Sequence, residues 1–92
     1  RTGLLDLSES RLREVPSEVF KLENLEVMYL THNALTELPK AFETLTTLKV
    51  LYLHNNNVSV FPSSLCDLSS LTWLNLNYNS LTEIPAEVRV FA

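Results

Sequence analysis

The prolines of this 92-residue chain are evenly spaced. Pro16, Pro39, Pro62 and Pro85 each lie 23 residues after the one before. A shift of the whole sequence by 23 residues also aligns several columns of apolar residues and one column of asparagines. Self-similarity at such a fixed period indicates a repeat architecture, in which each copy is one structural unit. The length allows one domain. We therefore expect residues 1–92 to form a single domain of about four copies: 2–24, 25–47, 48–70 and 71–92.

Each copy begins with a Leu-x-Leu alternation, which places two side chains on one face of a short strand. No copy can bury its own leucines alone, so the columns must stack into one continuous core. These columns include Leu7, Leu30, Leu53 and Leu76, and also Leu22, Leu45, Leu68 and Phe91. Proline fixes φ and removes a donor, so each proline ends strand pairing. The segments "PKAFETL" and "PSSLCDL" have apolar residues at i, i+3 and i+6, which favours short helical or 3-10 turns.

The columns read L-x-x-L-x-L-x-x-N-x-L-x-x-L-P-x-x-F-x-x-L-x-x, and this pattern resembles the leucine-rich repeat in its 23-residue form. Residues 25–47 match every fixed position except Met28, whereas Thr2, Ser10 and Phe91 depart from the pattern. The resemblance implies an α/β leucine-rich-repeat solenoid. It would have a four-stranded parallel sheet on its concave face and short helical or 3-10 turns on its convex face. Similar "LP" repeats occur in intracellular Ras-pathway and Scribble-type scaffold proteins.

The asparagine column has a structural explanation. After each strand the chain turns inward and leaves backbone N–H and C=O groups in an apolar interior, where unpaired polar groups are costly. A short amide carries both donors and acceptors and can satisfy them. We therefore assign Asn33, Asn56 and Asn79 a structural role. Of the neighbours of Asn56, we expect Asn55 to face solvent and Asn57 to occupy the turn, where asparagine is locally favoured.

The outward positions of each strand form the concave face in this family. In the second, third and fourth copies they are Val27, Tyr29, Thr31, His32, Val50, Tyr52, His54, Asn55, Trp73, Asn75, Asn77 and Tyr78. Tyrosine and tryptophan are enriched at binding hot spots, and an apolar sheet face is costly to leave bare. Alternatively, the tyrosines only stack across the strands. As partner-binding residues we select Val27, Tyr29, His32, Val50, Tyr52, His54, Trp73, Asn75 and Tyr78.

The sequence contains no recognisable catalytic constellation, metal site or cofactor motif. His32 and His54 lie on adjacent strands and can approach each other, but a zinc site needs three or four ligands. Cys66 belongs to the convex side, away from both histidines, so a Cys–His nucleophile pair is not expected. The net charge of −4 argues against a nucleic-acid partner, and no apolar run approaches the roughly 18 residues of a membrane span. We expect no enzyme activity within this chain.

The resemblance implies that the chain recognises another protein through its concave face, as an adaptor or scaffold in signal transduction. In the alternative interpretation it is the targeting segment of a larger signalling enzyme, such as a kinase, a ubiquitin ligase or a deadenylase. A purely structural repeat scaffold is a third possibility. The single cysteine favours a reducing, cytoplasmic location. The last copy offers no polar cap, so we expect more sequence past Ala92 and self-association through uncapped ends.

Overall fold

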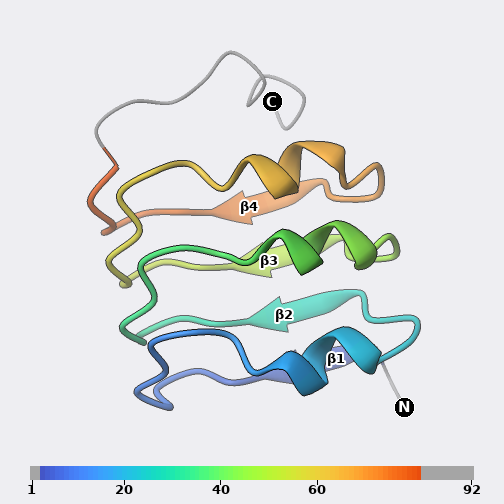
Figure 1. Cartoon of the computed structure of the whole chain (residues 1–92), viewed down its shortest axis with the longest axis horizontal. Coiled ribbons are helices and arrows are strands. Elements are labelled where there is room, and N and C mark those ends of the chain that lie inside the picture. Colours follow the sequence, from blue (N-terminus) through green and yellow to red (C-terminus); the bar gives the residue numbers. More distant parts are fainter. Residues whose placement is uncertain (1–2, 82–92) are drawn as a thin grey trace.

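The computed structural model describes residues 3–81, which contain a four-stranded parallel sheet (Figure 1). Strands β1 (Leu4–Asp6), β2 (Val27–Tyr29), β3 (Val50–Tyr52) and β4 (Trp73–Asn75) follow one another in the order of the sequence. Residues that are 23 apart in the chain are paired in the sheet, for example Leu5 with Met28 and Met28 with Leu51. The expected α/β solenoid with a parallel sheet is therefore confirmed.

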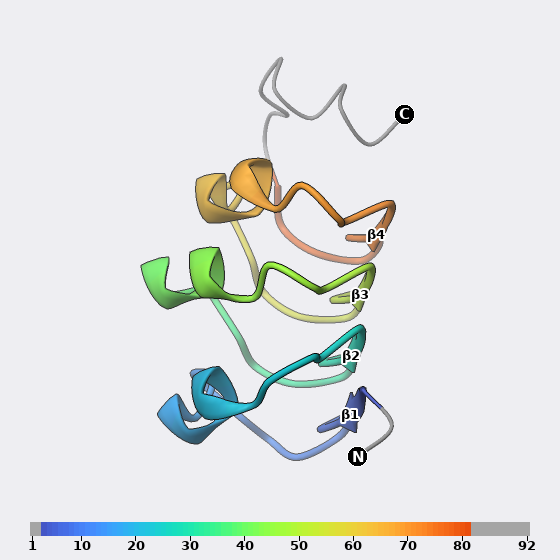
Figure 2. The ribbon, with the colours of Figure 1, turned by 90° about the vertical axis from the view of Figure 1, so that its right-hand side faces the viewer.

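Each strand is followed by a return segment that carries a short 3-10 helix. These helices are η1 (Ser17–Lys21), η2 (Lys40–Thr44) and η3 (Ser63–Asp67), and they lie on the side opposite the strands (Figure 2). Pro16, Pro39 and Pro62 occupy the N-cap positions with extended backbone. Each helix closes with a bond over three residues, such as Leu22 N–H to the Val19 carbonyl at 3.2 Å. The turns on the convex face are thus 3-10 helices, as predicted.

The core lies between the sheet and the 3-10 helices, and it is most complete in the second and third copies. Met28, Leu30, Leu51 and Leu53 are fully buried on the inner side of β2, β3 and their extensions. Their counterparts in the first and fourth copies are half-buried: Leu5, Leu7, Leu74 and Leu76. The gradient is expected when each copy contacts only its neighbours, because an end copy has a neighbour on one side only.

One column departs from the expected burial. Leu45 and Leu68 are buried, but the side chain of Leu22 in the first copy is 47% exposed. Phe20 lies beside it, half-buried, and packs edge-on against Phe42 with ring centroids 5.4 Å apart. Leu22 has only the second copy to cover it, and this is why an aligned position is not equally buried here. Ile84, Val88 and Phe91, the expected core residues of the fourth turn, lie outside the described residues.

No helix within residues 3–81 is long and apolar enough to cross a membrane.

Candidate partner-binding surface

Asn56 is buried and bonds to two copies at once. Its Nδ2 donates to the Leu30 carbonyl of the second copy at 2.8 Å and to the Leu53 carbonyl of its own copy at 3.1 Å. Its Oδ1 accepts from the Leu35 N–H at 3.0 Å. The amide therefore satisfies inner backbone groups that the parallel ladder leaves unpaired and ties the third copy to the second.

The other asparagines of the column repeat this arrangement. Asn33 reaches back to the Leu7 carbonyl at 3.0 Å, and Asn79 reaches back to the Leu53 carbonyl at 2.9 Å. Their Oδ1 atoms accept backbone N–H groups of the preceding copy, as Asn56 does. Ser10, at the equivalent position of the first copy, instead donates to the Ser8 carbonyl at 3.3 Å. An asparagine in this column thus stabilises the contact with the copy before it.

The residue before each column position has a left-handed backbone. Glu9, His32, Asn55 and Tyr78 have φ between 54° and 61°. We had expected the asparagine-favouring turn at Asn57, but the positive φ lies at Asn55. Asparagine tolerates this region better than most residues because its short side chain can bond locally. The sharp turn comes directly after the strand, so the chain enters the interior with the column asparagine already in place.

The outer face of the sheet carries an apolar row that crosses all four strands. Leu4, Val27, Val50 and Trp73 are paired in register and point away from the core. Val27 and Val50 are half-buried, whereas Leu4 is 52% and Trp73 55% exposed. We did not select Leu4 as a partner-binding residue from the sequence. Its position 23 residues before Val27 was the signal that could have identified it.

A second row, one strand position further on, carries the tyrosines. Tyr29 and Tyr52 are stacked with centroids 4.7 Å apart, and they are flanked in register by Asp6 on β1 and Asn75 on β4. Asp6 Oδ1 accepts the Ser8 N–H at 2.9 Å, and Asn75 Oδ1 accepts the equivalent N–H, of Asn77, at 3.0 Å. The bonds from the Ser8 backbone and then from its side chain lower the pKa of the exposed Asp6 carboxyl.

The two histidines are brought together beyond the tyrosine row. Their ring centroids are 5.8 Å apart at an interplanar angle of 79°, and His54 also lies edge-on to Tyr52 at 6.2 Å. His54 Nδ1 is buried without a hydrogen-bond partner. In residues 3–81 no group of three or more His, Cys, Asp or Glu side chains is placed to hold a metal ion. The pair is therefore an extension of the aromatic surface.

One outward position is not exposed. Thr31 retains only 6% of its surface, and its Oγ1 donates to the Ser8 Oγ at 3.1 Å across β1 and β2. We expected its side chain to face solvent beside His32, which is exposed. A short side chain is covered by its larger neighbours on the same face, so position alone does not determine accessibility. Tyr78, by contrast, is 79% exposed.

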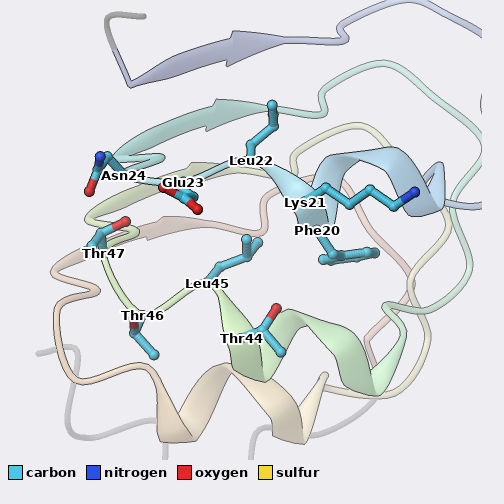
Figure 3. A pocket seen from close by; sticks show the side chains of 9 residues that line it. All are labelled: Phe20, Lys21, Leu22, Glu23, Asn24, Thr44, Leu45, Thr46 and Thr47. Carbon is cyan, nitrogen blue, oxygen red and sulfur yellow. The ribbon is translucent and has the colours of Figure 1, made fainter.

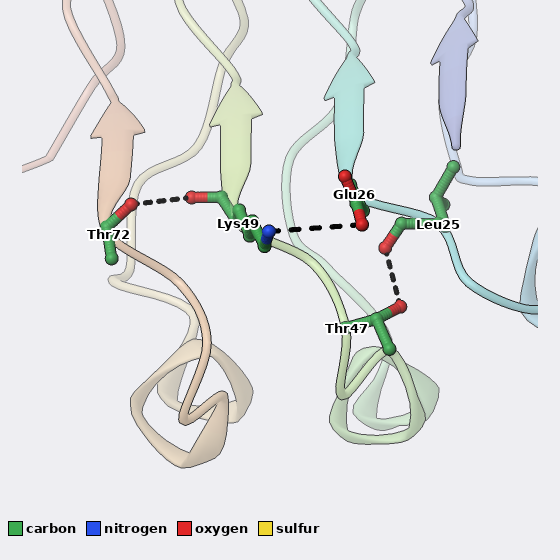
Figure 4. A network of polar contacts seen from close by, with 5 residues as sticks. All are labelled: Leu25, Glu26, Thr47, Lys49 and Thr72. Carbon is green, nitrogen blue, oxygen red and sulfur yellow. Dashed lines mark hydrogen bonds and ion pairs between the residues drawn. The ribbon is translucent and has the colours of Figure 1, made fainter. Parts of the chain in front are cut away.

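A polar network borders the face where the strands begin (Figure 4). Lys49 Nζ lies 3.9 Å from the Glu26 carboxylate, so these two opposite charges are paired across adjacent copies. Thr47 Oγ1 donates to the Leu25 carbonyl at 2.7 Å, and Thr72 Oγ1 donates to the Lys49 carbonyl at 3.3 Å. These contacts connect neighbouring copies before each strand, as the asparagines do after it.

A hollow of about 450 Å³ lies away from the sheet, between the segments that follow η1 and η2 (Figure 3). Thr44, Thr46 and Thr47 line one side of it, and Lys21 and Glu23 line the other. All five of these side chains are exposed. An open hollow of this kind desolvates no charged group and brings no nucleophile beside a base, which are the features expected of a catalytic site. The outer face of the sheet is therefore the stronger candidate.

Comparison with known proteins places the chain among repeat proteins. The sequence profile described as leucine rich repeat matches residues 4–58 and 39–81. A search of curated protein sequences gave no significant match. A solved structure titled as an LRR protein of Leptospira interrogans, LIC12759, is 33% identical over 88% of this chain, with a TM-score of 0.79.

A second solved structure is titled as the leucine-rich repeat domain of the type III effector XCV3220 (XopL). It is 29% identical over 92% of this chain, with a TM-score of 0.80. The chain spans only 21% of the first of these structures and 29% of the second.

Proposed function

The chain belongs to the leucine-rich repeat family, and from this premise we propose that it is an adaptor or scaffold module that binds a partner protein through its concave face. Repeats of this family generally mediate protein–protein interaction. The concave face is defined here by the apolar row (Leu4, Val27, Val50 and Trp73), the tyrosine row (Tyr29 and Tyr52), the histidine pair (His32 and His54), Asn75 and Tyr78.

The observation that carries the proposal is the exposure of the apolar row. Leu4 and Trp73 leave more than half of their surface in water at the two ends of the row. A contiguous exposed apolar surface on a folded domain usually marks an interaction site. Tryptophan is among the residues that contribute most to binding energy at interfaces. We therefore regard Trp73 as the leading anchor for the partner.

The tyrosines admit a purely structural explanation, since Tyr29 and Tyr52 cover one another. Stacking of this kind stabilises the sheet whether or not a partner binds. The same explanation does not extend to Trp73 and Tyr78, which remain 55% and 79% exposed. In our proposal the stacked tyrosines present a stiff surface, and Trp73 supplies the protruding contact.

Affinity capture with the intact chain and matched variants tests this function. The test variant carries Tyr29→Ala, Tyr52→Ala and Trp73→Ala. The control variant carries Leu22→Ala and Val60→Ala, which remove exposed apolar surface away from the proposed site. Both variants are first checked for cooperative thermal unfolding by circular dichroism.

We expect a captured partner to be retained by the control variant and lost by the test variant. In a purified system, Trp73→Ala or Tyr52→Ala alone should each cost at least about 2 kcal/mol of binding free energy. A partner that binds the folded test variant with unchanged affinity would show that the concave face is not the site.

We also propose the cytoplasm as the location of this module, because its single cysteine cannot form an internal disulfide. The alternative role, as the targeting segment of a larger signalling enzyme, has a weaker basis. In its favour, one matched structure is titled as a single domain of an effector. The full reading frame distinguishes an adaptor from a targeting segment, since the latter requires a catalytic domain in the same protein.

A further inference from the structure

The charges of the concave face are all at one end. Asp6 and Glu9 lie at outward positions of the first copy, and both are exposed. The outward positions of the next three copies carry no Asp, Glu, Lys or Arg. Glu26 and Lys49 lie before their strands and are paired with each other. The face therefore changes from acidic at β1 to apolar and aromatic at β4.

Asp6 is held in its charged form while remaining open to solvent. One carboxylate oxygen accepts the Ser8 N–H at 2.9 Å, and this bond lowers the pKa of the Asp6 carboxyl. An ionised carboxylate still has acceptor capacity on its other oxygen. Glu9 adds a second exposed carboxylate three residues further along the chain. A cationic side chain of a partner is the natural counterpart of this pair.

The spacing of the rows limits the shape of the partner. Neighbouring strands lie about 4.8 Å apart, so the apolar row extends about 14 Å from β1 to β4. An α-helix lying across the strands presents one turn every 5.4 Å, which drifts by only about 2 Å over this span. An extended segment presents same-face side chains about 6.8 Å apart and loses register by about 6 Å. A helix therefore matches the row better.

We propose that the partner of the concave face is a basic amphipathic α-helix. This inference rests on the proposed function and adds the chemistry of the partner to it. The apolar stripe of the helix lies along Val27, Val50 and Trp73. Lysine or arginine at one end of the helix lies over Asp6 and Glu9, about three turns from the residue that contacts Trp73.

The probe is a phage-displayed library of 16-residue helix-forming peptides with randomised residues on one face and at both ends. Selection is performed on the intact chain, and individual binders are then measured by fluorescence anisotropy. The key variant carries Asp6→Asn and Glu9→Gln. It preserves the turn after β1, because asparagine already makes the same bond at Asn75, to the Asn77 N–H at 3.0 Å. Trp73→Ala and the Leu22→Ala, Val60→Ala control complete the set.

We expect selected peptides to combine an apolar stripe with Lys or Arg at one end. The charge-neutral variant should bind them about three- to tenfold more weakly, as the loss of two solvent-exposed ion pairs implies. An increase in salt should weaken binding to the intact chain more than to this variant.

Enrichment of acidic peptides, no enrichment at all, or equal affinity for the charge-neutral variant would overturn the basic-helix proposal. If Trp73→Ala still abolishes binding in the last case, the proposed function survives and only the partner chemistry fails. If neither Trp73→Ala nor the charge-neutral variant changes the affinity, the peptides bind elsewhere and both proposals fail.

Discussion

Tyr29 and Tyr52 stack face to face across β2 and β3, with ring centroids 4.7 Å apart and an interplanar angle of 2°. The separation is close to the spacing of neighbouring strands, so the backbone register itself sets the stack. His54 lies edge-on to Tyr52, and His32 lies edge-on to His54. Four rings from two copies thus form one continuous surface. A surface ordered before binding loses less side-chain entropy when a partner arrives.

The tyrosine stack should be measurable as a coupling. In a double-mutant cycle for unfolding, Tyr29→Ala and Tyr52→Ala should show a coupling energy of about 0.5–1.5 kcal/mol. Tyr29→Ala combined with Asn75→Ala is the control, since two strand spacings separate these residues and their effects should add. Equal coupling in the two cycles would show that the ring contact is not its source.

Loss of the central asparagine should destabilise the fold. Asn56→Ala leaves the Leu30 and Leu53 carbonyls without this donor, and we expect a loss of about 1–3 kcal/mol in the free energy of unfolding. Asn57→Ala, at an exposed position two bonds along the same turn, should remain within about 0.5 kcal/mol. Urea denaturation measures both. Similar losses for the two variants would contradict the role assigned to Asn56.

Leucine truncation should depend on the copy and the column. Leu53→Ala removes a fully buried side chain in the middle of the stack and should cost about 2–5 kcal/mol. Leu22→Ala makes the same chemical change at a site that is 47% exposed, and it should cost about 1 kcal/mol or less. A larger loss at Leu22, in the same denaturation experiment, would mean that burial in the stack does not determine stability.

The left-handed turn after β4 should carry strain. Tyr78 has a φ of 58° and a side chain that is 79% exposed, so little packing is lost on its replacement. Tyr78→Asn should raise the free energy of unfolding by about 0.4–1 kcal/mol, because asparagine adopts this conformation more easily. Tyr78→Phe keeps the strain and should change nothing. Stabilisation by both variants would point to the hydroxyl group instead of the backbone.

Asp6 should contribute to the acid sensitivity of the fold. Its pKa is lowered from 3.8 by the Ser8 backbone bond and then by the Ser8 hydroxyl. A carboxyl with a lowered folded pKa stabilises the native state above its unfolded pKa, and this contribution is lost as the pH falls through the folded value. A carbon-detected NMR titration should therefore show Asp6 titrating below 3.8, and Ser8→Ala should raise its pKa part of the way back. An unchanged pKa in Ser8→Ala would assign the shift to the backbone bond alone.

The 23-residue period by itself determined the plan of the molecule. It placed the strands, their register, the proline-led turns and the asparagine column, because each depends only on which residues occupy equivalent positions in successive copies. Tertiary structure decided how each equivalent position is used. Leu22 is exposed and Leu45 is buried in the same column, since the first copy has one neighbour.

Local detail on the concave face was likewise decided by contacts between copies. Thr31 is covered by its larger neighbours, and the positive φ lies at Asn55 and not at Asn57. The stacking of the tyrosines and the approach of the histidines depend on side-chain rotamers in adjacent strands. A repeat pattern specifies which residues become neighbours. Only the packed structure determines how much of each side chain remains in water, because that depends on the size and orientation of those neighbours.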